Sequence, residues 1–340
     1  MSSSDSPVPS IALFALGGTI AAPVDAQGKN ASMSLGAGDI VGDLGDRAGV
    51  AVTATTFRRT ASASLRFADL IELLGAMTAA VASGADGVVV TLGTDSLEEV
   101  AFALDLLWGA DAPVVVTGAM RNAGLPGADG PANLLGALRV SAHPDAAGQG
   151  VLVVMNDEVH LARFVRKSHS SSVAAFSSAG IGPVGWLVED RVRIPVVRRH
   201  RPAPIALAAA PDASTSGGAL PTVTLLRLSL DDDPEAITRA AEHADGLVVE
   251  VFGAGHVSER SLPALRSAAA RIPVVFASRT GAGELYRSTG DFPGSEQDLL
   301  RAGLIPSGSL DGLKARVLLT LLLASDADRD TVARRFAAED

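Results

Sequence analysis

Two threonines in this chain occupy positions from which a side-chain hydroxyl could attack a substrate. Thr19 and Thr94 each follow a short apolar run and one or two glycines, in the segments ALGGTIA (15–21) and VTLGTDS (90–96). Glycine at such a point lets the backbone turn sharply and leaves N–H groups exposed, as in an anion or oxyanion pocket. A threonine hydroxyl is a weak nucleophile at neutral pH unless a base takes its proton, so this chemistry also needs a base.

The second threonine segment also fits a purely structural role. Asp95 or Ser96 could cap the helix that follows, and Ser96 with Glu99 has the spacing of a capping box. From these residues alone, capping is the favoured interpretation. Neither glycine segment has the spacing of a dinucleotide-binding fingerprint, and the sequence contains no G-x-x-x-x-G-K-[ST] phosphate loop. A Rossmann-type nucleotide-binding protein is therefore disfavoured.

Apolar runs, glycine turns and helical stretches alternate along the chain. The runs of the first half are continuous and are joined by amphipathic stretches, which predicts a parallel sheet buried on both faces. They cover residues 11–16, 87–92, 113–117 and 150–155. Ligands of open α/β sheets bind beyond the carboxyl ends of the strands, so both threonines stand where a site is expected.

Residues 201–220 separate two such α/β segments. This stretch (RPAPIALAAAPDASTSGGAL) is rich in Pro, Ala, Ser and Gly and has little periodicity, as is typical of a linker. The strand and helix alternation then resumes and ends in a helical region expected over 311–338. We therefore expect two α/β domains with mainly parallel sheets, the larger at 10–200 and the smaller at 221–340.

The composition excludes several classes of function. The chain has 340 residues, a formal net charge of −10 and no cysteine. Thiol nucleophiles, disulfides, iron–sulfur clusters and cysteine zinc sites are therefore excluded, and binding to a phosphate backbone is disfavoured. The histidines lie scattered without the spacing of a metal site. We expect no metal, no cofactor and no nucleic-acid partner.

The N-terminal residues MSSSDSPVPS contain neither a basic region nor a long apolar stretch, so they are not typical of a signal peptide. The apolar stretch 317–324 near the other end is too short to span a bilayer. We therefore expect a cytoplasmic protein with no membrane partner.

The order of the motifs resembles that of the bacterial-type L-asparaginase family. The resemblance rests on the two threonine segments, on PVVVTGAMRNAGLPGADGPANLLGAL at 113–138, on GVLVVMND at 150–157, on Lys167 and on DGLKARVLL at 311–319. It covers nearly the whole chain. It implies hydrolysis of L-asparagine to L-aspartate and ammonia through a threonine acyl-enzyme, on a small amino-acid amide as substrate. It also implies a homo-oligomer, a dimer or a tetramer.

The resemblance gives the catalytic roles. Thr19 matches the primary nucleophile of the family, while Thr94, Asp95 and Lys167 match its second cluster of a hydroxyl, a carboxylate and an amine. Lys167 can take a proton only in its neutral form, which a neighbouring carboxylate opposes. Asp95 is therefore expected to share its charge between Lys167 and the substrate's α-ammonium. Without the other motifs, Lys167 in the run RFVRK would be interpreted as a solvated lysine.

The resemblance also gives substrate-binding residues. Ser62, in ASASL at 61–65, matches the serine that holds the α-carboxylate of the substrate. Gly18 lies beside the nucleophile, where its backbone can approach the substrate. Thr94 and Asp95 are expected to bind substrate in addition to their catalytic roles.

Three positions depart from the family pattern, and each loses a polar group. Many members carry a tyrosine in the loop after the nucleophile, where this chain has Met33, and its one tyrosine is elsewhere in the sequence. The glutamine after the substrate serine is replaced by Ala63, and an asparagine near the subunit boundary by Ala254. The C-terminal glutamate of the family matches either Glu284 or Glu296.

Three other interpretations stay open or are disfavoured. A non-catalytic amino-acid-binding module of the same fold would explain the lost polar groups as decay, yet a binding protein does not need a nucleophile. A glutaminase-asparaginase with broad specificity is the second alternative. The amidase subunit of archaeal tRNA-dependent amidotransferases normally carries an extra N-terminal region, and the first strand expected here begins near residue 11.

Overall fold

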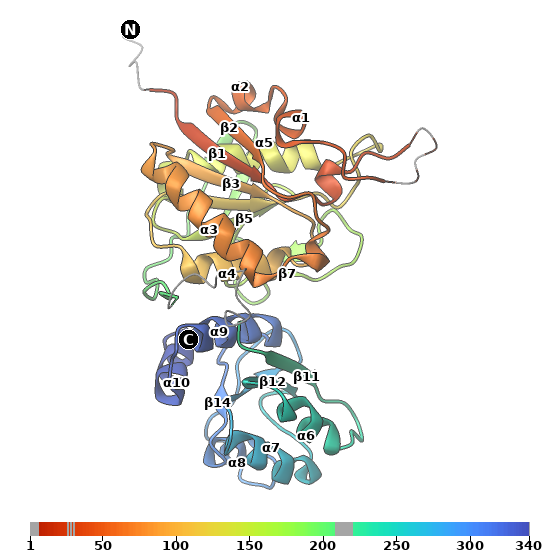
Figure 1. Cartoon of the computed structure of the whole chain (residues 1–340), viewed down its shortest axis with the longest axis vertical. Helices are drawn as coiled ribbons and strands as arrows, with labels where there is room; N and C mark the ends of the chain where they lie inside the picture. The colour runs from red at the N-terminus through yellow and green to blue at the C-terminus, as the bar shows by residue number, and fades with distance from the viewer. Residues whose placement is uncertain (1–6, 26, 28, 30, 208–219, 340) are drawn as a thin grey trace. The chain divides into compact units, whose positions relative to one another are not determined.

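The chain folds into two compact units, residues 1–201 and 202–340 (Figure 1). The computed structural model describes residues 7–25, 27, 29, 31–207 and 220–339. Each unit is an α/β domain with a mainly parallel sheet, so the predicted fold class is confirmed. Most of the predicted linker, residues 208–219, lies outside the described residues.

The described residues of the first unit form an eight-stranded sheet in the order β10-β9-β6-β5-β4-β3-β1-β2. Strands β2, β1, β3, β4 and β5 are parallel, and β6, β9 and β10 extend the sheet in antiparallel pairs. The continuous apolar runs form β3, β4 and β5, whose residues are all buried. The strands are β1 (Ser10–Ala15), β2 (Ala51–Thr56), β3 (Gly87–Thr91), β4 (Val114–Thr117), β5 (Val151–Met155), β6 (Glu158–Leu161), β9 (Gly185–Val188) and β10 (Arg191–Arg193).

Helices cover both faces of this sheet, which explains why its central strands are apolar throughout. Figure 1 shows α3 (Phe67–Ala82) and α4 (Leu97–Leu107) on one face. The helices α1 (Ala37–Val41), α2 (Leu44–Ala48) and α5 (Gly130–Ser141) lie on the other face and share one apolar core with β1. Three short 3₁₀ turns, η1 (Thr19–Ala21), η2 (Ser62–Ser64) and η3 (Pro144–Ala146), and the hairpin of β7 (Arg166–Lys167) and β8 (Phe176–Ser177) complete the described elements.

Within residues 220–339 the second unit forms a four-stranded parallel sheet in the order β11-β12-β13-β14. Its strands are β11 (Val223–Arg227), β12 (Gly246–Val251), β13 (Val274–Ser278) and β14 (Ile305–Pro306). Its helical elements are α6 (Glu235–Glu242), η4 (Glu259–Ser261), α7 (Leu262–Ala269), α8 (Glu296–Arg301), α9 (Gly312–Ala324) and α10 (Arg329–Ala338). No helix of the described residues is both long and apolar enough to cross a membrane.

The final helical region expected over 311–338 is confirmed, and it consists of two helices, α9 and α10. Asp311 and Asp328 each cap a helix, accepting hydrogen bonds from the N–H groups of Lys314 (2.9 Å) and Thr331 (2.8 Å). Between the helices Asp326 has a φ of 57°, which ends α9. Two aspartates at N-cap positions therefore begin two separate helices.

The sheet of the first unit brings the predicted site segments to one edge. The N–H of Leu16, at the end of β1, donates to the carbonyl of Thr91 at the end of β3 (2.8 Å). The N–H of Leu92 donates in turn to the carbonyl of Thr117 at the end of β4 (3.1 Å). The glycine segments that follow these strands therefore meet beyond their carboxyl ends, where ligands of open α/β sheets bind.

Candidate functional site

The segments that carry Thr19 and Thr94 touch through the backbone of two glycines. A Cβ placed on Gly18 would stand only 2.2 Å from the nitrogen of Gly93, a distance that no side chain can tolerate. Gly18 also has a φ of 84°, in the region that favours glycine. Thr19 comes directly after it as the first residue of η1. The Gly18–Gly93 contact therefore fixes the Thr19 segment against the Thr94 segment.

Ser62 packs closely against Gly93, since a Cβ placed on Gly93 would stand 2.8 Å from Ser62 Oγ. Ser62 is 3% exposed, and its Oγ accepts a hydrogen bond from the N–H of Asp95 (3.2 Å). The structure thus brings both Ser62 and Gly18 against Gly93 of the Thr94 segment. These two residues, for which a substrate-binding role is expected, lie at one place in the fold.

The predicted capping box of Ser96 and Glu99 is wrong. Ser96 is the N-cap residue of α4, but in the described structure its side chain makes no capping hydrogen bond. Its Oγ donates instead to the carbonyl of Ser62 (2.7 Å). Ser62 is buried, so its carbonyl needs a donor from within the protein, which Ser96 supplies. Ser96 therefore ties the Ser62 turn to the Thr94 segment.

Lys167 reaches this edge from the hairpin of β7 and β8. Its Nζ donates to Thr94 Oγ1 (2.9 Å) and to Asp95 Oδ1 (2.8 Å). Its side chain is only 15% exposed, so the interpretation as a solvated lysine is wrong, whereas that of Asp95 is 71% exposed. An amine, a buried hydroxyl and a carboxylate in direct contact can move a proton and still present one carboxylate oxygen to a charged ligand.

The segment after β4 is held by a carboxylate to which the sequence analysis assigns no role. Asp129, the N-cap residue of α5, accepts hydrogen bonds from the N–H groups of Met120 (2.9 Å) and Arg121 (2.8 Å). Asn133 Nδ2 donates to the same carboxylate (3.1 Å). The turn after Gly118 is therefore rigidly attached to the first turn of α5.

Asn133 extends this attachment to the end of β5. Its Nδ2 also donates to the carbonyl of Gly118 (3.0 Å), and its Oδ1 accepts from the N–H of Asn156 after β5 (2.9 Å). Gly118 packs on Thr94, since a Cβ there would lie 3.4 Å from Thr94 Cγ2. Asn133 is 3% exposed. Its spacing of four residues from Asp129 on one helix face was the signal that sequence reasoning missed.

Met33 covers the Thr19 segment from the loop that follows it. Its Sδ accepts a hydrogen bond from the N–H of Gly18 (3.2 Å) and would stand 3.1 Å from a Cβ on Gly17. A thioether is a weak acceptor compared with an oxygen. The position at which the family resemblance expects a tyrosine therefore touches the turn before Thr19 through a sulfur atom.

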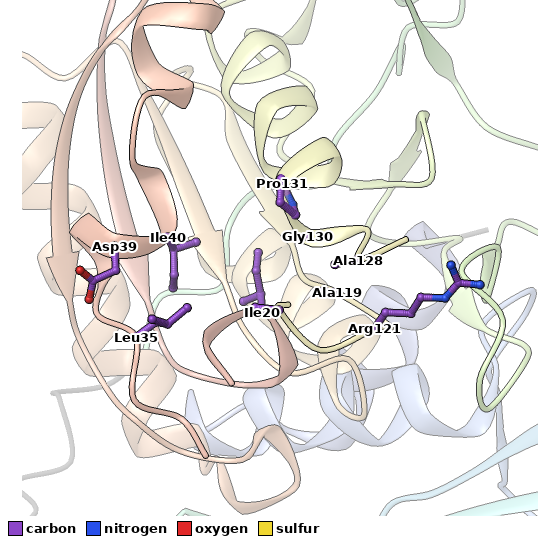
Figure 2. Close-up of a pocket in the computed structure, with 10 residues that line it drawn as sticks. Ile20, Leu35, Asp39, Ile40, Ala119, Arg121, Ala128, Gly130 and Pro131 are labelled. Carbon is purple, nitrogen blue, oxygen red and sulfur yellow. The ribbon is translucent and has the colours of Figure 1, made fainter. Parts of the chain in front are cut away.

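A cavity of about 150 Å³ lies beside the Thr19 segment, lined by Ile20, by residues of the α1 region and by the turn after β4 (Figure 2). Its walls are mainly apolar, and Figure 2 shows the carboxylate of Asp39 and the guanidinium of Arg121 directed away from Ile20. Among the described residues, none of the six predicted site residues lines it. An amino acid carries two charges that such walls would leave unpaired, so this cavity does not suit a free amino acid.

The two candidate glutamates of the second unit have different surroundings. Glu284 is exposed, whereas Glu296 is fully buried and its Oε1 accepts from the N–H groups of Thr289 (2.7 Å) and Gly290 (2.5 Å). Burial would raise the pKa of Glu296, but these donors and His256, 3.4 Å from Oε2, hold it below its ordinary value. Ala254 accepts a hydrogen bond from Tyr286 through its carbonyl (2.8 Å).

Within the described part of the chain, no group of three or more His, Cys, Asp or Glu residues could hold a metal ion. The predicted catalytic residues Thr94, Asp95 and Lys167 make direct contact, and Thr19 approaches them through Gly18 and Gly93.

Comparison with known proteins gives matches over both units. The family model "Asparaginase, N-terminal" matches residues 10–198, and the model "Glutaminase/Asparaginase C-terminal domain" matches residues 222–336. An L-asparaginase of Bacillus licheniformis is 31% identical over 318 residues, which cover 93% of this chain and 95% of that protein.

Two further proteins are similar over most of their length. A probable L-asparaginase of Deinococcus radiodurans is 35% identical over 260 residues, covering 75% of this chain and 76% of that protein. The crystal structure of a probable cytoplasmic L-asparaginase from Campylobacter jejuni has a TM-score of 0.82 and 30% identity, and the match covers 97% of this chain and 99% of that one.

Proposed function

Since this chain belongs to the asparaginase family, we propose that the cluster around Thr94 makes it an L-asparagine amidohydrolase with Thr19 as the nucleophile. The reaction converts L-asparagine and water to L-aspartate and ammonia. The single observation that carries the proposal is the contact of Lys167 Nζ with both Thr94 Oγ1 and Asp95 Oδ1. A protein that only binds amino acids has no use for an amine held on a buried hydroxyl.

The first half of the reaction forms an ester on Thr19. Its hydroxyl oxygen attacks the carboxamide carbon, the C–N bond breaks, and the nitrogen leaves as ammonia with the proton that Thr19 gave up. Thr94 and Lys167 carry that proton, because an amide nitrogen leaves only when it is protonated. The backbone N–H groups of the two glycine segments are the proposed hydrogen-bond donors to the developing oxyanion of the substrate.

The second half of the reaction releases aspartate. A water molecule gives a proton to the pair of Thr94 and Lys167 and attacks the ester carbon. The bond to Thr19 then breaks, and the Thr19 oxygen takes back a proton. The same proton carrier thus serves both halves, in the manner of Ser/Thr–Lys hydrolases.

Ser62 and Asp95 anchor the substrate. Ser62 Oγ accepts one hydrogen bond from the Asp95 N–H, which leaves its hydroxyl proton for the substrate's α-carboxylate. The carboxylate of Asp95 is engaged by Lys167 at Oδ1 and is mostly exposed, so Oδ2 can accept the α-ammonium. The missing side chain of Gly18 lets the Thr19 segment lie directly against the Thr94 segment, so that the Gly18 backbone lies beside the substrate.

The active form is a homo-oligomer, a dimer or a tetramer, in the cytoplasm. Residues 10–200 and 221–340 are its two domains, joined by 201–220. The match to the probable cytoplasmic L-asparaginase supports the location, and light scattering of the purified chain tests the assembly. A fully active monomer would contradict the proposal that the active form is a homo-oligomer.

A glutaminase-asparaginase of broad specificity is the second candidate, supported by the Glutaminase/Asparaginase model that matches the C-terminal unit. A side-by-side assay of ammonia release from L-asparagine and L-glutamine separates the two. Release from L-asparagine alone supports the first candidate, and comparable release from both supports the second. Binding of L-aspartate without release of ammonia from either amide would show a non-catalytic binding protein.

A further inference from the structure

The sulfur atoms of this chain are distributed unevenly with respect to solvent. The sequence has five methionines and no cysteine. Of the four methionines that the structure describes, Met77 and Met155 are 0% and 1% exposed, whereas Met33 and Met120 are partly exposed. Among the described residues, the partly exposed methionines therefore lie on the loop after Thr19 and on the turn after β4.

Met33 is the one of these two whose sulfur is shown in contact with the Thr19 turn. Its Sδ accepts the N–H of Gly18 and lies within 3.1 Å of the position of a Gly17 Cβ. Gly18 is also in close backbone contact with Gly93. The glycine turn therefore contacts both the thioether and the Thr94 segment, so a change at Met33 acts on the turn that precedes Thr19.

We propose that Met33 is a site of oxidative modification through which a hydroperoxide inactivates the enzyme. This inference rests on the proposed function, because its effect is exerted on the Thr19 turn. In the reaction a lone pair on Met33 Sδ attacks the distal oxygen of the peroxide, and the O–O bond breaks. The sulfur becomes a sulfoxide, and the peroxide leaves as an alcohol, or as water in the case of hydrogen peroxide.

The sulfoxide changes the contact with Gly18 in two ways. It adds an oxygen atom to a sulfur that lies 3.2 Å from the Gly18 nitrogen, and it replaces a weak acceptor by a strong polar one. The turn must shift to make room, and the Thr19 hydroxyl shifts with it. Small displacements of a catalytic group cost on the order of tenfold to a hundredfold in rate.

The test treats the full-length protein with hydrogen peroxide and follows two quantities in each sample. One is the fraction of the Met33 peptide that has gained an oxygen, measured by mass spectrometry. The other is ammonia release from L-asparagine. We expect activity to fall in proportion to oxidation of Met33, to a residual value on the order of a tenth or less, and to return on treatment with methionine sulfoxide reductases.

Two variants show which methionine is responsible for the loss of activity in peroxide. The Met33→Leu variant keeps a side chain of similar volume without a sulfur, and its activity is expected to resist peroxide. The Met120→Leu variant leaves Met33 in place, and its activity is expected to fall as in the wild type. Full oxidation of Met33 with unchanged activity, or equal loss in Met33→Leu and wild type, would overturn the proposal.

Hydrogen exchange separates this inference from the proposed function. The exchange rate of the Gly18 amide is expected to change after oxidation of Met33, because the acceptor of its hydrogen bond is altered and the turn shifts. This readout needs no activity. If the untreated protein releases no ammonia from L-asparagine or L-glutamine, the proposed function fails. Unchanged exchange at Gly18 in fully oxidised protein would instead reject the role of Met33.

Discussion

Lys167 Nζ lies 2.9 Å from Thr94 Oγ1, although 73 residues of sequence separate the two. The hydroxyl is held at the carboxyl end of β3 and the amine by the short hairpin of β7 and β8. Asp95 then fixes the amine by a second contact at 2.8 Å. The proton carrier of the proposed reaction therefore depends on the tertiary structure of the first unit and not on any local sequence motif.

The Lys167→Met variant is expected to lose activity by about 10²- to 10⁴-fold in kcat, the usual value of a positioned acid–base group. The Lys167→Arg variant keeps the positive charge but cannot act as a base at neutral pH, so its kcat should be equally low. Steady-state ammonia release measures both. A Lys167→Arg enzyme with near-normal kcat would show that Lys167 supplies only charge.

The Asn133→Asp variant tests the attachment of the Gly118 turn. The new carboxylate cannot donate to the Gly118 carbonyl and repels Asp129, so kcat should fall about tenfold and stability by about 1 to 3 kcal/mol. The matched control is Asn156→Gly, since Asn156 uses only its backbone N–H in this network and has a φ of 52°. The control is expected to keep normal kcat and stability. Equal kcat in Asn133→Asp and wild type contradicts the positioning role.

The Gly18→Ala variant should lose both activity and stability, because its Cβ would collide with the backbone of Gly93 at a positive φ. Gly75 offers the matched control, since it lies within α3 and a Cβ there meets no atom within 4 Å. Gly75→Ala should raise the free energy of unfolding by about 1 kcal/mol through helix propensity. Denaturant unfolding and ammonia release measure both variants. An active and stable Gly18→Ala protein would refute the close approach of the two glycine segments.

Much of this site could be predicted from sequence, because apolar runs that end in glycine mark strand ends. That pattern placed Thr19 and Thr94 at one edge of the sheet. The contact of Lys167 could not be predicted from its own neighbourhood, where the run RFVRK favours a solvated lysine. The hydrogen bond from Gly18 to Met33 was equally hidden, since a backbone donor leaves no trace in the sequence. The resemblance to a family, and not residue chemistry, supplied the roles.

The wrong prediction of a capping box has a physical cause. Ser96 and Glu99 have the spacing of a capping box, but a hydroxyl can be used elsewhere when a buried carbonyl lies within reach, as that of Ser62 does. Local spacing identifies groups that can pair, and tertiary packing decides which pairs form.

The free energy of unfolding should depend on pH through His160, which is fully buried. Its Nδ1 lies 2.9 Å from Ser178 Oγ, and its Nε2 lies 3.3 Å from Glu158 Oε2. Burial lowers the pKa of His160 to about 4 from 6.5. Between these values the unfolded chain binds a proton that the folded chain does not, so stability falls as pH decreases.

The His160→Gln variant removes this titration. Between pH 7 and pH 4 the wild type should lose about 2 to 3 kcal/mol more of its unfolding free energy than the variant does. Urea unfolding at the two pH values gives the difference. The exposed His243 is the control position, and His243→Gln should behave as the wild type. Identical pH dependence in wild type and His160→Gln would exclude the buried neutral imidazole as the cause.

Ammonia release from L-asparagine by the Thr19→Ala variant, measured together with its affinity for L-aspartate, tests the central claim most directly. The account predicts that turnover falls on the order of 10³-fold or more, because no acyl-enzyme can form. Aspartate affinity should stay close to that of the wild type, since Ser62 and Asp95 are untouched. Turnover near that of the wild type would contradict the account and assign the nucleophile to Thr94.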